Sequence, residues 1–161
     1  MLFRSDRGGP EVGFQLLVYP VTEMNFDTAS YRENATGYGL TLEAMRWYWK
    51  QYLAEETQAN DAYAAPMRAS TLAGLPPALV ITAEFDPLCD EGEAYAARLR
   101  DAGVDTAVTR YDGMIHGFFG MASVLDKGAK AVSEGARAVR QALGEPPFTR
   151  AQVRVNSRNA S

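Results

Sequence analysis

Three short stretches of the chain are rich in apolar residues. Residues 14–21 (FQLLVYPV) form a nearly continuous apolar run, and residues 79–83 (LVITA) form a second one. Residues 106–111 (TAVTRY) alternate between apolar and polar positions. Continuous apolar runs are typical of strands buried on both faces, whereas alternation indicates a strand with one face less covered. We therefore predict a parallel sheet, with the third strand nearer its edge.

Helical patterns lie between and after these strands. Residues 42–53 carry apolar side chains at helical spacing, a helix is predicted to begin after Asp90 as its N-cap, and residues 124–143 form a last amphipathic helix. Strands and helices therefore alternate, which predicts an α/β fold with helices over the sheet. The intervening residues 22–40 and 54–77 are expected to be loops.

Composition excludes several kinds of site and partner. The net charge is −4, so we expect no nucleic-acid partner. One cysteine and one histidine exclude an internal disulfide, a cysteine-based zinc site and a multi-histidine metal site. No apolar run approaches the roughly 18 residues of a membrane span. Residues 1–5 are too short to be a signal peptide, so we expect a cytoplasmic protein.

An acid and the histidine follow two successive strands. Asp86 comes just after the second strand, and His116 comes just after the third. In parallel sheets, sites form beyond the carboxyl ends of the strands, where both side chains converge. A lone histidine is more often a packed or surface residue, and an Asp-Pro pair is more often a turn. Together, however, they are the pair in which a carboxylate orients an imidazole for general-base catalysis.

Apolar residues beside this pair are candidates for a substrate pocket: Leu88, Ile115, Phe118 and Phe119. Cys89 lies near a predicted helix N-terminus, where the pKa of a thiol falls, and could in principle be a nucleophile. It lies three residues past the acid on the same loop, so a buried, unreactive thiol is the better interpretation.

Several segments resemble one known family. Residues 75–88 (LPPALVITAEFDPL), continued by residues 90–92 (DEG), closely resemble the acid-bearing segment of the hormone-sensitive-lipase-like esterases, which have the α/β-hydrolase fold. Residues 111–118 (YDGMIHGF) are similar to their histidine segment. Residues 15–21 (QLLVYPV) look like the strand that follows their nucleophile elbow. The resemblance covers residues 6–143.

The resemblance implies that Asp86 is the acid and His116 the base of a Ser-His-Asp triad. The family's Gly-Asp-Ser-Ala-Gly-like elbow and its oxyanion loop are not in the chain. No serine has glycines two positions before and two after it; the serines are Ser5, Ser30, Ser70, Ser123, Ser133, Ser157 and Ser161. We therefore expect a partial α/β-hydrolase fold without its amino-terminal half: residues 1–145 are the carboxyl-terminal part of one domain, and residues 146–161 are a disordered tail.

The function implied by the resemblance is hydrolysis of a small acyl ester, with no cofactor or metal. Without a nucleophile and an oxyanion hole, we expect the chain to be inactive alone, and an unpaired strand would leave it marginally stable. Two alternatives remain open: a non-catalytic binding or assembly half-domain, and an α/β-hydrolase that acts on amides or peptides. Family members often dimerise through the last strand and helix, so residues 106–111 and 124–143 are the expected surface of a homodimer.

Overall fold

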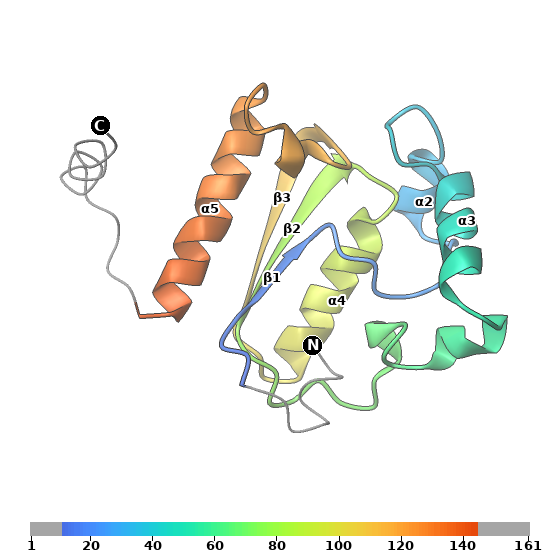
Figure 1. Ribbon diagram of the computed structural model, residues 1–161, viewed down its shortest axis with the longest axis horizontal. Coiled ribbons are helices and arrows are strands. Elements are labelled where there is room, and N and C mark those ends of the chain that lie inside the picture. Colours follow the sequence, from blue (N-terminus) through green and yellow to red (C-terminus); the bar gives the residue numbers. More distant parts are fainter. Residues whose placement is uncertain (1–10, 145–161) are drawn as a thin grey trace, which may run out of the picture.

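A parallel sheet forms the centre of the protein. The computed structural model describes residues 11–144, and the tail predicted at residues 146–161 lies outside that range. Three strands, β1 (Gln15–Val18), β2 (Ala78–Phe85) and β3 (Thr106–Ile115), lie in the order β1-β2-β3, and both neighbouring pairs are parallel (Figure 1). The expected α/β fold is therefore confirmed, and each predicted strand forms.

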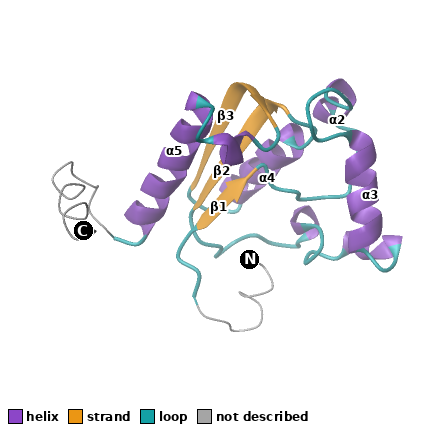
Figure 2. Ribbon diagram, turned by 45° about the horizontal axis from the view of Figure 1, so that its top comes forward, coloured by secondary structure: helices purple, strands orange, loops and turns teal. Residues whose placement is uncertain are grey.

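Helices cover both faces of this sheet. α4 (Cys89–Asp101) packs on one face and α5 (Asp126–Ala142) on the other (Figure 2). Successive residues of β1 point to opposite layers, because Leu17 packs with the α4 cluster and Leu16 with the α5 cluster. Burial on both sides explains why β1 and β2 are apolar runs rather than alternating ones. Buried members of the two clusters include Ala78, Tyr95, Leu99 and Val104 on the α4 side, and Leu79, Ile81, Ala83 and Tyr111 on the α5 side.

Two glycines let α5 approach the rest of the domain closely. A Cβ on Gly135 would lie 3.0 Å from Cδ2 of Leu16, and a Cβ on Gly128 would lie 2.7 Å from the carbonyl oxygen of Phe118. These residues weaken the helix by propensity. Their lack of a side chain is what allows the helix to contact β1 and the turn after β3.

A second group of helices lies beside the sheet. It consists of α2 (Ala29–Glu33), α3 (Leu42–Tyr52) and two 3₁₀ turns, η1 (Glu56–Asn60) and η2 (Pro66–Arg68). In Figure 1 these elements lie on the far side of α4 from α5. α2 and α3 share a core with residue 65 and the loop after β2, formed by Tyr31, Met45, Trp49, Ala65 and Leu88. The aromatic helix predicted at residues 42–53 is therefore confirmed, and it faces this core.

The expectation that residues 22–40 are a loop was wrong in one place. α2 forms there, and its N-terminus is capped by the hydroxyl of Thr28, which accepts a hydrogen bond from the N–H of Tyr31 at 3.2 Å. A helix of five residues is too short to show an apolar stripe in the sequence. It is stabilised by its cap and by the complete burial of Tyr31.

Candidate active site

Asp86 directly follows β2 and is held by the backbone of its own loop. Its Oδ1 accepts a hydrogen bond from the N–H of Leu88 at 2.9 Å, and its carbonyl accepts one from Cys89 at 3.1 Å. The side chain is fully buried. These bonds start α4 at Cys89, with Leu88 as its N-cap, two residues before the predicted N-cap at Asp90. Asp90 instead accepts a hydrogen bond from the N–H of Ser30.

His116 directly follows β3, which is longer than predicted. The register shifts near its end, so that Ala83 pairs with Tyr111 but Phe85 pairs with Ile115. Gly113 lies in this irregularity at φ +76°, and its N–H donates to the carboxylate of Glu84 on β2. The bulge lets β3 continue to Ile115, beyond the predicted end of the strand at residue 111, and delivers His116 to the edge that carries Asp86.

The structure brings the two predicted residues together. Nδ1 of His116 lies 2.8 Å from Oδ2 of Asp86. A carboxylate can only accept, so in the neutral imidazole Nδ1 carries the hydrogen and Nε2 has a free lone pair. The imidazole is 27% exposed and the carboxylate is 0% exposed. A base that is partly accessible and oriented by a buried acid is suited to take a proton from a nucleophile.

Tyr19, which comes directly after the β1 strand, lies against the imidazole ring. The centroids of its ring and the His116 ring are 4.3 Å apart at an interplanar angle of 48°. Burial, and then the charge of Asp86, raise the pKa of Tyr19, so it remains a neutral phenol. Tyr19 was not among the predicted site residues. Its position near the carboxyl end of the strand predicted at residues 14–21 was the signal that could have indicated it.

The predicted pocket residues divide into two pairs. Leu88 and Phe118 are fully buried, Leu88 in the core shared with α3 and Phe118 beneath Tyr111. Ile115 and Phe119 are partly exposed at the edge that carries the acid and the base. Ile115 and Phe119 therefore remain the candidates for direct contact with a substrate, whereas Leu88 and Phe118 support the residues around them.

Side chains of α2 and of its C-cap residue, Asn34, fix the acid loop, and neither was among the predicted site residues. The hydroxyl of Ser30 donates to the carbonyl of Pro87 at 2.7 Å. The amide of Asn34 donates to the carbonyls of Glu84 at 3.3 Å and Asp86 at 3.4 Å. These contacts join residues 50 or more positions apart. No local pattern in the sequence could have indicated them.

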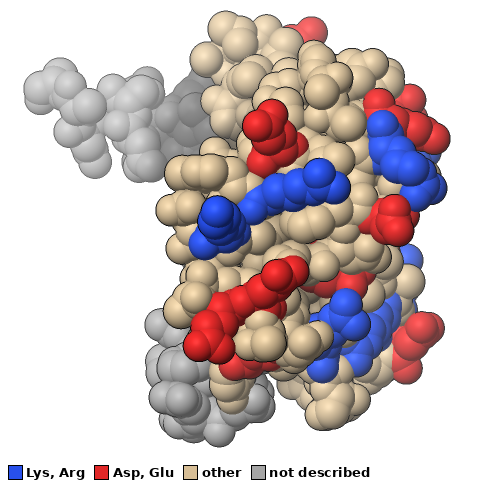
Figure 3. Space-filling model, turned by 90° about the vertical axis from the view of Figure 1, so that its right-hand side faces the viewer, with Lys and Arg blue, Asp and Glu red and all other residues tan. Residues whose placement is uncertain are grey.

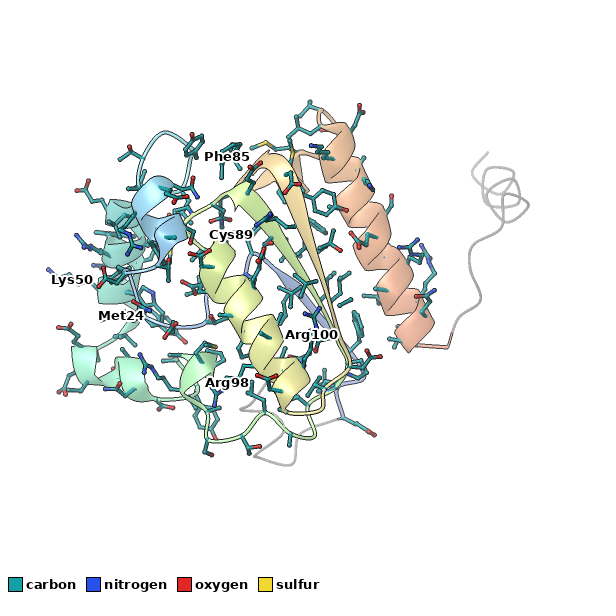
Figure 4. The ribbon with its side chains drawn as sticks, turned by 180° about the vertical axis from the view of Figure 1, so that it is seen from behind. Met24, Lys50, Phe85, Cys89, Arg98 and Arg100 are labelled. Carbon is teal, nitrogen blue, oxygen red and sulfur yellow. The ribbon has the colours of Figure 1, made fainter. Side chains whose placement is uncertain are left out.

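The thiol of Cys89 is unsuited to be a nucleophile. Cys89 lies at the start of α4, just beyond Phe85 at the end of β2, whereas Arg98 and Arg100 lie near the other end of the helix (Figure 4). Burial, and then the charge of Glu93, raise the pKa of the thiol to about 12. Cys89 is therefore protonated at neutral pH, which supports the interpretation as a buried, unreactive residue.

Other features of the described residues bear on ligands and surroundings. Within residues 11–144, no group of three or more His, Cys, Asp or Glu side chains converges in a way that could hold a metal ion. In the same range, no helix has the length and apolar character needed to cross a membrane. On the face that carries α3, basic and acidic side chains are interspersed (Figure 3).

Comparison with known proteins gives consistent matches. Residues 1–120 match the profile of a family described as having the α/β-hydrolase fold. Esterase LipI of Mycobacterium tuberculosis is 38% identical over 139 residues, which are 86% of this chain and 43% of that protein. Ethyl acetate hydrolase of Pseudomonas putida is 31% identical over 129 residues, which are 80% of this chain and 41% of that protein.

Solved structures agree with these sequence matches. The ester hydrolase EH1AB1, from the metagenome of Lake Arreo, is 41% identical with a TM-score of 0.82, over 89% of this chain and 45% of that one. The hyperthermophilic esterase of Pyrobaculum calidifontis is 40% identical with a TM-score of 0.82, over 87% of this chain and 47% of that one. The chain thus spans less than half the length of these relatives.

Proposed function

Because the chain belongs to the α/β-hydrolase family, we propose that it is the acid- and base-bearing part of a carboxylic-ester hydrolase. The observation that carries this proposal is the 2.8 Å hydrogen bond between Nδ1 of His116 and Oδ2 of Asp86. The esterase relatives support the choice of an acyl ester as substrate.

In the proposed reaction, a serine outside these 161 residues attacks the carbonyl carbon of a small ester. Nε2 of His116 accepts the proton of the serine, and Asp86 stabilises the imidazolium through the hydrogen on Nδ1. His116 then gives the proton to the departing alkoxide, which leaves as the alcohol. Water, deprotonated by the same nitrogen, attacks the acyl-serine, releases the acid and restores the serine. Ile115 and Phe119 contact the acyl or alcohol group.

The serines of this chain do not fit the role of nucleophile. None lies in a Gly-x-Ser-x-Gly elbow. The hydroxyl of Ser30 donates to the carbonyl of Pro87, and that of Ser133 donates to the carbonyl of Ala129 within α5. Each missing oxyanion donor removes roughly 2.7–4 kcal/mol of transition-state stabilisation. We therefore expect no ester turnover from the chain alone.

A chimera tests the proposal. The amino-terminal region of the Pyrobaculum calidifontis esterase is joined to this chain, which replaces the matching carboxyl-terminal region of that enzyme. The chimera is expected to hydrolyse p-nitrophenyl butyrate, and His116→Ala and Asp86→Ala are expected to abolish the activity. The unmodified esterase is the positive control, and circular dichroism checks that each protein folds. A folded chimera that is inactive, or whose activity survives His116→Ala, would contradict the proposal.

The edge of β1 supports a second candidate, a non-catalytic assembly module. Among residues 11–144, β1 pairs only with β2, so its other edge has no strand beside it. Oε1 of Gln15 on this strand is buried without a hydrogen-bond partner among the described residues. Such an edge can accept a strand from another chain. A monodisperse oligomer of this chain, together with an inactive but folded chimera, would favour this function.

The chimera also distinguishes ester from amide substrates. The residues described do not discriminate between them, because both reactions use the same base and acid. Matched p-nitrophenyl ester and p-nitroanilide substrates should be cleaved at very different rates, with the ester preferred. A preference for the anilide would instead make the protein an amide or peptide hydrolase.

A further inference from the structure

We propose that Tyr19 positions the imidazole of His116, and that contacts with α4 hold the strained backbone on which Tyr19 does so. This inference rests on the proposed function, in which His116 is the base. Among the described residues, Tyr19 is the only non-glycine residue with a positive φ, at +36°. Residues other than glycine rarely adopt a backbone conformation with positive φ unless the surrounding structure enforces it. Residues that do so cluster at functional sites.

The ring contact supplies what the hydrogen bond to Asp86 cannot. The bond holds one atom of the imidazole, Nδ1, but the ring can still rock through small changes in its side-chain torsion angles. Tyr19 lies against the ring at 4.3 Å between centroids and is itself packed against Phe118, at 6.2 Å. The second contact point limits rocking, and it therefore fixes where the lone pair of Nε2 points.

One turn of α4 contacts residues 19–23, the segment that contains Tyr19. The turn offers a notch at Gly92, where a Cβ would lie 3.4 Å from Cδ of Pro20 and 3.1 Å from Cγ2 of Thr82. Pro20, the residue after Tyr19, occupies the open space that this glycine leaves. On the other side of the segment, the N–H of Tyr19 donates to the carbonyl of Ile81 on β2 at 2.6 Å.

The residue before the notch, Glu91, anchors the end of the same segment. Its Oε1 accepts hydrogen bonds from the N–H groups of Thr22 at 2.6 Å and Glu23 at 3.4 Å. The hydroxyl of Thr22 donates to the backbone carbonyl of Glu91 at 3.3 Å. Glu91 is only 1% exposed, and the proposed reaction does not use it. A buried carboxyl group that accepts backbone N–H groups here holds residues 19–23 in place, and so helps Tyr19 to keep its unfavourable backbone conformation.

Nuclear magnetic resonance can read the state of this imidazole directly. The chain has one histidine, so every imidazole signal belongs to His116. Above neutral pH, the ring ¹⁵N shifts report which nitrogen is protonated, and the ring proton shifts report the neighbouring aromatic face. We expect the Nδ1-protonated tautomer and an upfield ring-current shift in the complete 161-residue chain.

Three substitutions of Tyr19 separate the ring from the hydroxyl and from the strain. Tyr19→Phe keeps the ring and should retain both signals. Tyr19→Ala and Tyr19→Gly should lose the upfield shift, and their ¹⁵N shifts should move towards the average of the two tautomers. In the active chimera, Tyr19→Ala should lower kcat by about tenfold or more relative to Tyr19→Phe, with little change in KM.

A variant on α4 tests the clamp without touching the ring. Gly92→Ala pushes on Pro20 and Thr82, and it should cause the same loss of tautomer order as Tyr19→Ala. Gly13→Ala is the matched control, because a Cβ there meets nothing within 4 Å. If Tyr19→Ala does not fold, Gly92→Ala and Tyr19→Gly decide. Wild-type imidazole signals in folded Tyr19→Ala, Tyr19→Gly or Gly92→Ala would overturn the inference. Because these signals need no hydrolysis, that result is distinct from an inactive chimera, which overturns only the proposed function.

Discussion

Asp86 and His116 are 30 positions apart in the chain, yet Oδ2 of one lies 2.8 Å from Nδ1 of the other. They meet because β2 and β3 are adjacent and parallel, so the residues that follow the two strands share one edge of the sheet. Asp86 is fixed by the N–H of Leu88, and His116 is delivered by a bulge that holds Gly113. The pair is thus supported by two strands rather than by flexible loops.

The first prediction concerns the tautomer of His116. An amide at position 86 can donate to Nδ1, so Asp86→Asn should shift the imidazole to the Nε2-protonated form, which cannot accept a proton from a nucleophile. Ring ¹⁵N shifts at pH 8 measure this directly. In the chimera, kcat should fall by about 10⁴-fold, as expected when the base has the wrong tautomer. Asp112→Asn, an exposed acid near the same edge, should change neither quantity. An unchanged tautomer in Asp86→Asn would show that Asp86 does not orient the ring.

The part of this site that could be predicted depends on sequence patterns of short range. β1 and β2 are buried on both faces, so each appears in the sequence as an apolar run that predicts a strand. The closeness of Asp86 and His116 was then predicted from their positions just after two successive strands. The end of β3 could not be predicted, because a glycine at position 113 is typical of a turn. Only the strand register and the hydrogen bond from its N–H to the carboxylate of Glu84 reveal that Gly113 lies in a bulge.

The residues that could not be predicted act over long separations. Ser30 and Asn34 hold the acid loop through hydrogen bonds to backbone carbonyls that lie 57 and 50 positions further along the chain. The strain at Tyr19 depends on α4, about 70 residues further along the chain. Hydrophobicity also gave Leu88 as a pocket candidate, but it cannot distinguish a pocket wall from the core, where Leu88 lies.

The second prediction concerns Cys89, the only cysteine of the chain. With the pKa of its thiol at about 12, the thiolate is a minute fraction at pH 8. Iodoacetamide should therefore label the native protein at least about 10²-fold more slowly than the protein unfolded in guanidinium chloride. Cys89→Ala should leave ester hydrolysis by the chimera intact. Rapid labelling of the native thiol, or loss of turnover in Cys89→Ala, would revive a role for Cys89.

The third prediction compares the two glycines of α5. A Cβ on Gly128 meets the backbone oxygen of Phe118 at 2.7 Å, which cannot move freely, so Gly128→Ala should lower the free energy of unfolding by about 1–3 kcal/mol. A Cβ on Gly135 meets the flexible side chain of Leu16 at 3.0 Å. The higher helix propensity of alanine offsets this contact by up to about 1 kcal/mol in the free energy of unfolding. Gly135→Ala should therefore be close to neutral. Urea unfolding measures both variants, and equal effects would mean that the close approach at Gly128 does not limit packing.

The last prediction concerns the pH dependence of stability. Burial raises the pKa of Glu91 from 4.5 to about 7, although the N–H groups of Thr22 and Glu23 and the hydroxyl of Tyr31 favour its ionised form. The folded state therefore holds this proton more tightly than the unfolded state does. Stability from Glu91 is fully present below about pH 4.5 and is lost as the pH rises through about 7. The shift corresponds to a loss of about 3 kcal/mol.

Glu91→Gln isolates this effect, because a glutamine keeps an acceptor for Thr22 and places a donor beside Tyr31 but does not ionise. The variant should match the wild type near pH 4.5 and exceed it by about 2–3 kcal/mol at pH 8, measured by urea unfolding at both values. Glu33→Gln, an exposed acid on α2, is the control and should follow the wild type throughout. A constant difference between Glu91→Gln and the wild type across this range would mean that Glu91 is already ionised at low pH. The anchor of residues 19–23 would then not depend on protonation.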